Sequence, residues 1–390
     1  MGRFHKHIMN IPWESADNHL AINPAQPEAA EGLDEFLRSR NLQGLCLFQT
    51  SGSEGTPKWV GLTKSAALIS AAAVNAHFEV TAEDHWLIAL PLHHVGGFSI
   101  LARAHLSGSR VTQSLARWNP QEFADLCERE GITLVSLVPT QVHDVVQARI
   151  TCPDSIRAAI VGGGGMSQAL ADSAMELGWR VFQSYGMTEA FSQIATQPYN
   201  SFGPVFDVKS LEVLPHWELT TDASVTLTLR GPALASGYAS RSASGEWRWE
   251  AIPMEGLTTR DRVRLWMHGT RQFLQFTGRE SGYIKILGEL VHLAPLQEQI
   301  ENLARQLGWA SLPVLVPLPD ARAETKLILV VESGMPDPQE LMQAFHQQSP
   351  PWLRISQSFF CMAIPRSDLG KVRGLELTEI VGRALSTREI

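Results

Sequence analysis

Short apolar runs alternate with amphipathic stretches through the first half of the chain. Helices are predicted at Pro120 to Glu130 and Gln168 to Leu177, and strands at Ile132 to Val138 and Ala158 to Val161. Alternation of this kind predicts βαβ units and a largely parallel sheet, with ligands bound beyond the carboxyl ends of its strands.

The pattern changes after Val205. Up to Phe276 the chain carries short strands of alternating apolar and polar residues with Gly- or Asp-containing turns, which predict a β-rich subdomain. A glycine-containing break at residues 279–282 ends this region. A helix with one apolar face comes next at Pro295 to Leu307, among short apolar strands that indicate a small α+β domain.

These changes predict an α/β protein of two domains. The large N-terminal α/β domain with its β-rich subdomain covers residues 1–278, of which residues 1–40 form an arm with few periodic apolar positions. Residues 279–282 are the predicted hinge, and residues 283–390 are the small, mobile C-terminal domain. A length of 390 residues suits one large domain plus a smaller one.

Composition narrows the classes of function. The formal net charge is -8 and no block of Lys and Arg appears, so a nucleic-acid partner is not expected and small-molecule chemistry is favoured. The 4 cysteines are widely spaced and include no CxxC pair, which favours reduced thiols over a disulfide frame or a zinc site. No stretch reaches the length of a membrane span and no secretory leader is visible, so a cytoplasmic location is expected.

A stretch of small, hydroxyl-rich residues lies directly after an apolar strand. Residues 50–58 (TSGSEGTPK) come after Leu45 to Phe48 and offer backbone N–H groups, hydroxyls and one lysine that could surround a phosphate. Their spacing differs from the common NTPase loop, because Pro57 precedes Lys58 and Trp59 comes after it. An ordinary surface turn is the alternative for this stretch.

Two further predicted strands end in candidate ligand loops. One loop is the run Gly162 to Gly165, which lacks the GxGxxG spacing of a dinucleotide site. The other is Ser184 to Glu189 (SYGMTE). A loop is also predicted after the strand Trp86 to Leu90, and it carries His93, His94, Gly96 and Gly97.

Four motifs in this order resemble those of the adenylate-forming superfamily, which includes acyl-CoA synthetases, luciferases and the adenylation domains of nonribosomal peptide synthesis. They are residues 50–58 (TSGSEGTPK), 184–189 (SYGMTE), 258–261 with 277–280 (TTRD and TGRE) and 365–371 (PRSDLGK). Residues 90–108 (LPLHHVGGFSILARAHLSG) and 185–196 (YGMTEAFSQIAT) are further similar to the o-succinylbenzoate-CoA ligases of menaquinone biosynthesis.

The resemblance implies ATP, Mg²⁺ and coenzyme A as ligands. Lys371 would be catalytic by bridging the reacting carboxylate and the α-phosphate, two anions whose repulsion must be neutralised. Glu189 would hold the metal that accompanies ATP, and Thr188 would contact the phosphates. Tyr185 would stack on adenine and Asp261 would accept hydrogen bonds from the ribose. The ATP-binding residues implied are Thr50, Ser51, Gly52, Ser53, Lys58, Gly163, Gly164, Ser184, Tyr185, Gly186, Met187, Asp261 and Arg279.

Outside this family context, Lys371 could be a solvated loop lysine, and Thr188 with Glu189 could be a helix cap. Tyr185 could be a core aromatic residue. Asp261 and Arg279 could be a surface ion pair.

The acyl side of the implied site needs a donor or a cation, because o-succinylbenzoate carries a second carboxylate and a ketone besides the carboxylate that reacts. Arg103 and Ser192 meet this requirement. A helix-surface arginine is the alternative for Arg103, and a core histidine or a gate residue for His94. The substrate-binding candidates are His94, Ser99, Arg103, Gly164 and Ser192.

The sequence departs from the superfamily pattern at several points. Glu54 stands where Thr is usual and Trp59 replaces a usual Gly, so both bear on the affinity for ATP. Ser281 occupies the hinge position that is usually Asp, and with Gly282 it still permits a large backbone rotation. The segment before the phosphate loop is short, so the arm or a partner subunit, as in a homodimer, is expected to cover apolar surface.

The predicted activity is ATP-dependent ligation of a small carboxylic acid to coenzyme A through an acyl-AMP, with o-succinylbenzoate as the acid. Another aryl or acyl acid, or a carrier protein as thiol acceptor, is the nearest alternative. A non-catalytic nucleotide-binding relative is the alternative of another class, suggested by Glu54, Trp59 and the short N-terminal segment.

Overall fold

The contacts of the chain divide it into two compact units. The large unit comprises residues 1–259 and 263–276, and the small unit comprises residues 260–262 and 277–390. The computed structural model describes residues 11–50, 58–114, 117–200, 207–242, 244–279, 282–287, 289–320, 323–368 and 370–386.

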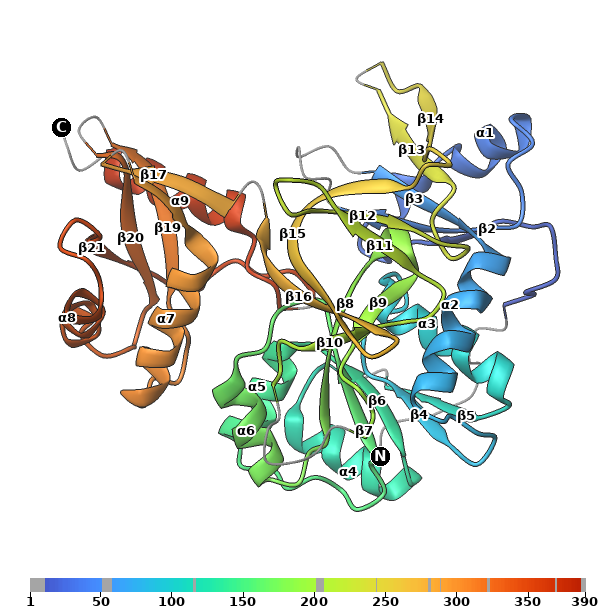
Figure 1. Ribbon diagram of the computed structural model, residues 1–390, viewed down its shortest axis with the longest axis horizontal. Helices are drawn as coiled ribbons and strands as arrows, with labels where there is room; N and C mark the ends of the chain where they lie inside the picture. Colours follow the sequence, from blue (N-terminus) through green and yellow to red (C-terminus); the bar gives the residue numbers. More distant parts are fainter. Residues whose placement is uncertain are drawn as a thin grey trace. The chain divides into compact units, whose positions relative to one another are not determined.

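A long mixed sheet forms the centre of the large unit, with the strand order β11-β12-β15-β16-β10-β9-β8-β7-β6-β4-β5 (Figure 1). Strands β5, β4, β6, β7 and β8 pair in parallel, and β9 and β10 continue antiparallel. The parallel region and the β-rich region predicted from the sequence therefore share one sheet. Its strands are Glu218–Thr221, Thr226–Arg230, Leu257–His268, Arg271–Arg279, Leu211–Val213, Ser192–Thr196, Val181–Met187, Ala158–Val161, Leu134–Leu137, His85–Ile88 and Arg110–Gln113, in the same order.

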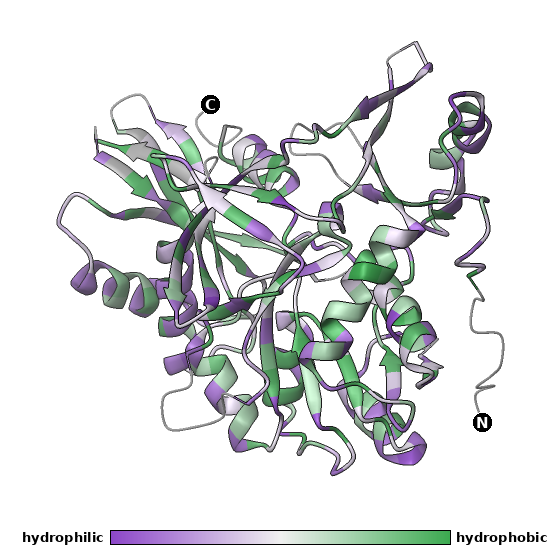
Figure 2. Cartoon of the chain, turned by 45° about the vertical axis from the view of Figure 1, so that its right-hand side comes forward, coloured by the Kyte–Doolittle hydropathy of each residue, from purple (hydrophilic) through white to green (hydrophobic). Residues whose placement is uncertain are grey.

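Helices connect the parallel strands and cover the sheet, as predicted. Their ends obey local capping rules: the Thr63 hydroxyl accepts from Ala66 N at 3.0 Å to begin α2, and Asn119 caps α4. Figure 2 shows hydrophobic residues concentrated in the parallel strands and hydrophilic ones on the outer helices. The helices are η1 Pro27–Ala30, α1 Leu33–Ser39, α2 Lys64–His77, α3 Val95–Ser107, α4 Pro120–Glu130, α5 Pro139–Gln147, α6 Gln168–Glu176 and η2 Thr188–Ala190.

The structure has a loop at His93 and His94, but Gly96 and Gly97, which were predicted to lie in the same loop, belong to a helix. Helix α3 begins at Val95, and Gly96 and Gly97 lie in its first turn. Two glycines lower helix propensity, which concealed the helix in the sequence. Gly97 is needed for close packing, because a Cβ there would lie 2.5 Å from the carbonyl oxygen of Leu90 and 2.6 Å from that of Pro91.

A second sheet of the large unit has the order β1-β2-β3-β13-β14. Strands β2 and β3 are antiparallel neighbours with Thr50 opposite Lys58, so the phosphate-loop stretch joins two strands of one hairpin. Residues 51–57, which include Ser51, Gly52, Ser53 and Glu54, lie outside the described residues. The strands of this sheet are His19–Ala21, Leu45–Thr50, Lys58–Thr63, Gly237–Arg241 and Trp247–Ala251.

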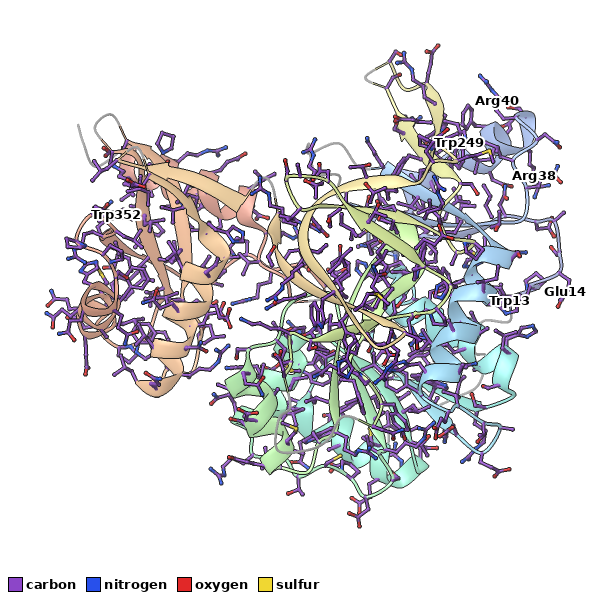
Figure 3. All side chains as sticks on the ribbon, in the orientation of Figure 1. Trp13, Glu14, Arg38, Arg40, Trp249 and Trp352 are labelled. Atoms are coloured by element: carbon purple, nitrogen blue, oxygen red, sulfur yellow. The ribbon has the colours of Figure 1, made fainter. Side chains whose placement is uncertain are left out.

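Trp59 lies on the face of this second sheet that packs against α1. Its side chain is 1% exposed and belongs to a small apolar cluster with Leu33 and Leu37 of α1. Trp249 of β14 packs on the same cluster, and Figure 3 labels it near Arg38 of α1. Because side chains alternate along a strand, Trp59 and Lys58 face opposite sides, so the tryptophan does not occupy the lysine's side of the sheet.

Residues of the N-terminal arm pack against apolar residues of the large unit. Ile11 and Trp13 are 4% and 6% exposed and belong to the main core cluster. The Trp13 ring meets Phe98 of α3 edge-on at 6.1 Å between centroids. Lys64, the first residue of α2, donates from Nζ to the carbonyl oxygens of Pro12 at 2.7 Å and Ser15 at 3.0 Å.

The small unit is an α+β fold, as predicted. Its three-stranded sheet has the order β19-β20-β21, next to the β17-β18 hairpin. Its elements are β17 Tyr283–Ile286, β18 Glu289–His292, α7 Leu293–Gln306, β19 Val314–Asp320, β20 Glu324–Glu332, α8 Gln339–Gln348, β21 Ile355–Cys361 and α9 Gly374–Ser386. Across the residues that the structure describes, no helix combines the length and hydropathy needed to cross a bilayer.

Candidate active site

The motif at residues 184–189 runs from the end of β8 into the short helix η2. Ser184 is buried, and its hydroxyl donates to the carbonyl oxygen of Val161 at 3.1 Å. Tyr185 is half-buried and stacks on Phe276 with 5.8 Å between ring centroids and 27° between planes. A half-buried aromatic ring of this kind suits stacking on an adenine ring. Phe276 has no counterpart in the motifs and was not predicted.

Gly186 makes room for the return strand β9. A Cβ at Gly186 would lie 1.6 Å from the carbonyl oxygen of Ser192, so no other residue fits without a backbone shift. The pairing of β8 and β9 also shifts register between Tyr185 and Gly186. The glycine therefore brings Ser192 close to the motif, while Met187 ends β8 half-buried.

The Gly162 to Gly165 run is held by a residue that sequence reasoning missed. Gln183 of β8 is buried, and its Nε2 donates to the carbonyl oxygen of Gly164 at 3.0 Å, while its Oε1 accepts from Met166 N at 2.7 Å. Gly163 has φ +74, a left-handed conformation that favours glycine. One side chain thus fixes an exposed glycine loop beside Ser184.

Glu189 and Lys58 share a partner, Tyr238 of β13. The Tyr238 hydroxyl donates to Glu189 Oε1 at 3.2 Å, and Lys58 Nζ lies 5.6 Å from the centroid of the same ring. Thr188 is half-buried beside Glu189, and Thr50 donates its hydroxyl to the carbonyl oxygen of Lys58 at 3.4 Å. A carboxylate and a hydroxyl are the hard oxygen donors that Mg²⁺ prefers, so these residues fit the implied metal.

Arg103 and Ser192, two residues predicted for the acyl pocket, are in contact. Arg103 of α3 is 1% exposed, and its Nη2 donates to Ser192 Oγ at 3.2 Å. Its Nη1 lies 3.4 Å from Ser136 Oγ, and its guanidinium carbon lies 5.4 Å from the centroid of the Trp86 ring. Burial lowers the pKa of Arg103 to about 9. The helix-surface alternative for Arg103 is wrong.

No carboxylate among the described residues forms an ion pair with Arg103, and its Nε is buried with no hydrogen-bond partner in that part of the chain. A buried cation without a counter-ion is costly unless an anion is bound beside it. The site can therefore accept a negatively charged group.

The other two acyl-side candidates sit at the start of α3. Ser99 is buried, and its hydroxyl donates to the carbonyl oxygen of Gly96 in the same helix at 3.4 Å. His94 is the half-buried residue just before α3, with its ring centroid 4.4 Å from that of His93. Both lie at the helix that carries Arg103, so α3 organises this side of the site.

The small unit gathers the remaining candidates. Asp261 is 4% exposed, and its Oδ1 accepts from Arg279 Nε at 2.6 Å. Lys371 is exposed over much of its side chain, yet burial around its ammonium group and the charge of Arg279 lower its pKa, against the opposing effect of Asp261. Ser281, the predicted hinge residue, lies outside the described residues.

Lys371 ends a closed turn. Its backbone N–H donates to Ser367 Oγ at 3.2 Å, its carbonyl oxygen accepts from Ser367 N at 2.7 Å, and Gly370 adopts φ +71. Arg366 Nη1 donates to the carbonyl oxygen of Gly370 at 3.1 Å. The catalytic-lysine candidate is thus presented by a turn rather than by a helix or strand.

Comparison with known proteins shows the family of the chain. The AMP-binding enzyme family matches residues 21–239, more than half of the chain, so the chain belongs to this family. This confirms the adenylate-forming resemblance and the α/β fold class.

Among individual relatives, a 2-succinylbenzoate–CoA ligase of Bacillus subtilis is 33% identical over 192 residues, which are 49% of this chain and 38% of that protein. A 2-succinylbenzoate–CoA ligase of Bacillus cereus is 27% identical over 354 residues, covering 87% of this chain and 70% of that protein. The chain thus spans well under the full length of these relatives.

A solved structure of the Bacillus subtilis o-succinylbenzoate-CoA synthetase with its acyl-adenylate intermediate is similar as well. It has a TM-score of 0.71 and 26% identity, over 85% of this chain and 68% of that chain. The same enzyme in complex with ATP and a magnesium ion also gives a TM-score of 0.71.

Proposed function

We propose that the chain is an ATP-dependent acid–CoA ligase that converts o-succinylbenzoate to its CoA thioester through an acyl-AMP. Membership of the AMP-binding family and the likeness to 2-succinylbenzoate–CoA ligases support this proposal. A cytoplasmic location and a homodimer stay predictions, which cell fractionation and analytical ultracentrifugation would test.

The buried Arg103 carries the choice of acid. A fatty acid or a simple aromatic acid would leave this cation desolvated and without a counter-ion in the part of the chain that the structure describes, whereas the second carboxylate of o-succinylbenzoate would supply the missing charge. Ser192 would add a hydroxyl to the same carboxylate or to the ketone. Charge complementarity of this kind selects a substrate by penalising neutral competitors.

The first step joins the acid to AMP. A carboxylate oxygen of the acid attacks the α-phosphorus of ATP, the bond to the bridging oxygen breaks, and pyrophosphate leaves with the electron pair. Lys371 would neutralise the two anions as they approach, and Lys58 would hold the phosphates. When bound, Mg²⁺ would offset the charge that develops on the leaving pyrophosphate, with Glu189 and Thr188 as its protein donors.

The second step forms the thioester. The CoA sulfur attacks the acyl carbonyl, the bond to AMP breaks, and the thiol proton passes to solvent. Rotation of the small unit about residues 279–282 would first withdraw Lys371 and admit the thiol.

The test is a panel of carboxylic acids assayed by pyrophosphate release, with and without CoA. The panel contains o-succinylbenzoate, its analogue without the succinyl carboxylate, benzoate and a medium-chain fatty acid. We expect the highest kcat/KM for o-succinylbenzoate and thioester formation only when CoA is present. Preference for the analogue without the second carboxylate would overturn the choice of acid. If none of the acids in the panel gives pyrophosphate release, the proposal of a ligase is overturned.

A further inference from the structure

We propose that Tyr238 is a positioning residue for magnesium-bound ATP, with its hydroxyl orienting the Glu189 carboxylate and its ring holding the Lys58 ammonium. This inference rests on the proposed function, because that function gives Glu189 and Lys58 their ligands. Tyr238 lies in none of the motifs that carry the family resemblance.

The sheet fixes Tyr238 between the two charged residues. Strand β13 pairs antiparallel with β3, so that Tyr238 lies opposite Val60 and Ser240 lies opposite Lys58. Residues opposite each other share a face of the sheet, and so do residues two apart along a strand. Tyr238 and Lys58 therefore lie on one face of the sheet. Ala239 lies on the other face, in the small apolar cluster that contains Trp59.

The start of β13 is held rigidly. A Cβ at Gly237 would lie 2.4 Å from the carbonyl oxygen of Glu250 and 2.7 Å from the Trp249 ring, so the neighbouring strand β14 packs directly on this backbone. Two residues earlier, Ala235 N donates to the main-chain carbonyl oxygen of Glu189 at 2.8 Å. The segment that leads into β13 thus binds Glu189 by its backbone, and Tyr238 binds it again by its side chain.

The hydroxyl contact is suited to a metal-holding carboxylate. The phenol donates one proton to Glu189 Oε1 at 3.2 Å, and a carboxylate can accept more than one such contact. A phenol ordinarily ionises only at about pH 10, so the hydroxyl keeps its proton at neutral pH. Partners of this kind fix the orientation of a ligating carboxylate, and their loss weakens metal binding.

The ring contact serves the other charge. Lys58 Nζ lies 5.6 Å from the ring centroid, within the range at which an ammonium is attracted to an aromatic face. A lysine side chain has many rotamers, and a ring that holds it reduces the freedom it loses on binding a phosphate. Tyr238 therefore offers an uncharged partner to both a cation and an anion.

The two contacts predict two separable effects. Loss of the hydroxyl alone weakens only the part of ATP binding that depends on Mg²⁺, because it acts through Glu189. Loss of the ring also weakens binding of ATP without metal, because it acts through Lys58.

The experiment measures ATP affinity by isothermal titration calorimetry without any acid, so that no turnover occurs. Wild type, Tyr238→Phe and Tyr238→Leu are compared in excess EDTA and across an Mg²⁺ titration. We expect Tyr238→Phe to bind magnesium-bound ATP about tenfold more weakly and to leave the affinity in EDTA unchanged. We expect Tyr238→Leu to lose affinity in both conditions.

The matched control is Tyr199→Phe. The Tyr199 hydroxyl accepts from Arg157 Nη1 at 2.7 Å, in a network with Asp84 that touches neither Lys58 nor Glu189. We expect this variant to keep the wild-type Mg²⁺ dependence. In a Glu189→Gln background, Tyr238→Phe should cause no further loss, because the two residues act through one contact.

Three results would overturn the inference: a wild-type Mg²⁺ dependence in Tyr238→Phe, an equal loss in EDTA and in Mg²⁺, or additive losses in the double variant. These outcomes leave the proposed function standing whenever the wild-type protein binds ATP and releases pyrophosphate with o-succinylbenzoate. Failure of the wild-type protein to bind ATP in any condition would overturn both.

Discussion

Two cations with proposed roles in the reaction, Arg103 and Lys371, are held in opposite ways. Arg103 lies on a buried helix of the large unit, with its side chain 1% exposed and fixed by Ser192, Ser136 and Trp86. Lys371 ends an exposed turn of the small unit. Burial lowers the pKa of both, but only Arg103 is closed off from water. Under the proposed function, the charge that would select the acid is built into the core, while the charge that would assist adenylation is presented on a turn.

The largest expected effect concerns Lys371. Lys371→Ala should lower pyrophosphate release at least a hundredfold, because removing one preorganised charge-stabilising group costs about 10²–10³ in rate. Thioester formation from supplied acyl-AMP and CoA should stay close to the wild-type rate. Single-turnover assays of the two half-reactions measure both quantities. An equal loss in both halves would contradict the assignment of Lys371 and remove its contrast with Arg103.

Arg103 should matter for binding of the acid but not for the stability of the fold. Arg103→Met should raise KM for o-succinylbenzoate by roughly a hundredfold, the effect of losing a charged hydrogen-bonding partner. The same variant should melt no lower than wild type, because an apolar side chain replaces a desolvated cation. Steady-state kinetics and differential scanning calorimetry measure these effects, with Arg110→Met as an exposed control. A higher KM together with a much lower melting temperature would show that Arg103 supports the fold and does not select the acid.

Ser192 sharpens the same comparison through its backbone. Ser192 has φ 111 and comes directly after Phe191 with φ 49. Residues other than glycine rarely adopt these backbone conformations. Ser192→Ala and Ser192→Gly should each raise KM for the acid about fivefold, the worth of one hydrogen bond of about 1 kcal/mol. Only Ser192→Gly should raise the melting temperature, by relieving roughly 1 kcal/mol of strain. A lower melting temperature for Ser192→Gly would show that the backbone is not strained.

The smallest effect is a shift in the pH profile of adenylation. Lys371 must be protonated to act as a cation, so pyrophosphate release should fall as pH rises through its pKa, which lies below the ordinary value of 10.5. Arg279 is one cause of the lowered pKa. Arg279→Gln should therefore move the alkaline limb of kcat to higher pH. Arg373→Gln is the control, and a downward shift in Arg279→Gln would be the contrary result.

Periodicity predicted much of the fold. The parallel strands of the large unit and the helix at Pro120–Glu130 were predicted because apolar runs and capping residues act locally. Helix α3 was missed because its two early glycines oppose local propensity, and only the packing of Gly97 against Leu90 explains them. The pairing of β2 with β3 was missed because residues 50–58 indicated a loop but gave no sign of the strand that begins at Lys58.

The candidate site divides along the same line. Arg103 and Ser192 could be predicted because an anionic acid requires a donor, and the structure brings them within 3.2 Å. Gln183, Tyr238 and Phe276 act through contacts with distant segments, so no local motif announces them. For Gln183 a weak signal existed, since an amide in an otherwise apolar strand needs partners for its donors and acceptors. The roles of the predicted residues stay predictions until the variants are measured.

The ammonium of Lys64 fixes the N-terminal arm to the start of α2. A lysine at the first position of a helix opposes the helix dipole, and this one is 4% exposed, so the carbonyl oxygens of Pro12 and Ser15 are what make its burial tolerable. Truncation past Ser15 would remove both carbonyl acceptors from the buried Lys64 ammonium. An expression tag or a protease site placed there would act on the interior of the large unit, not on a dispensable tail.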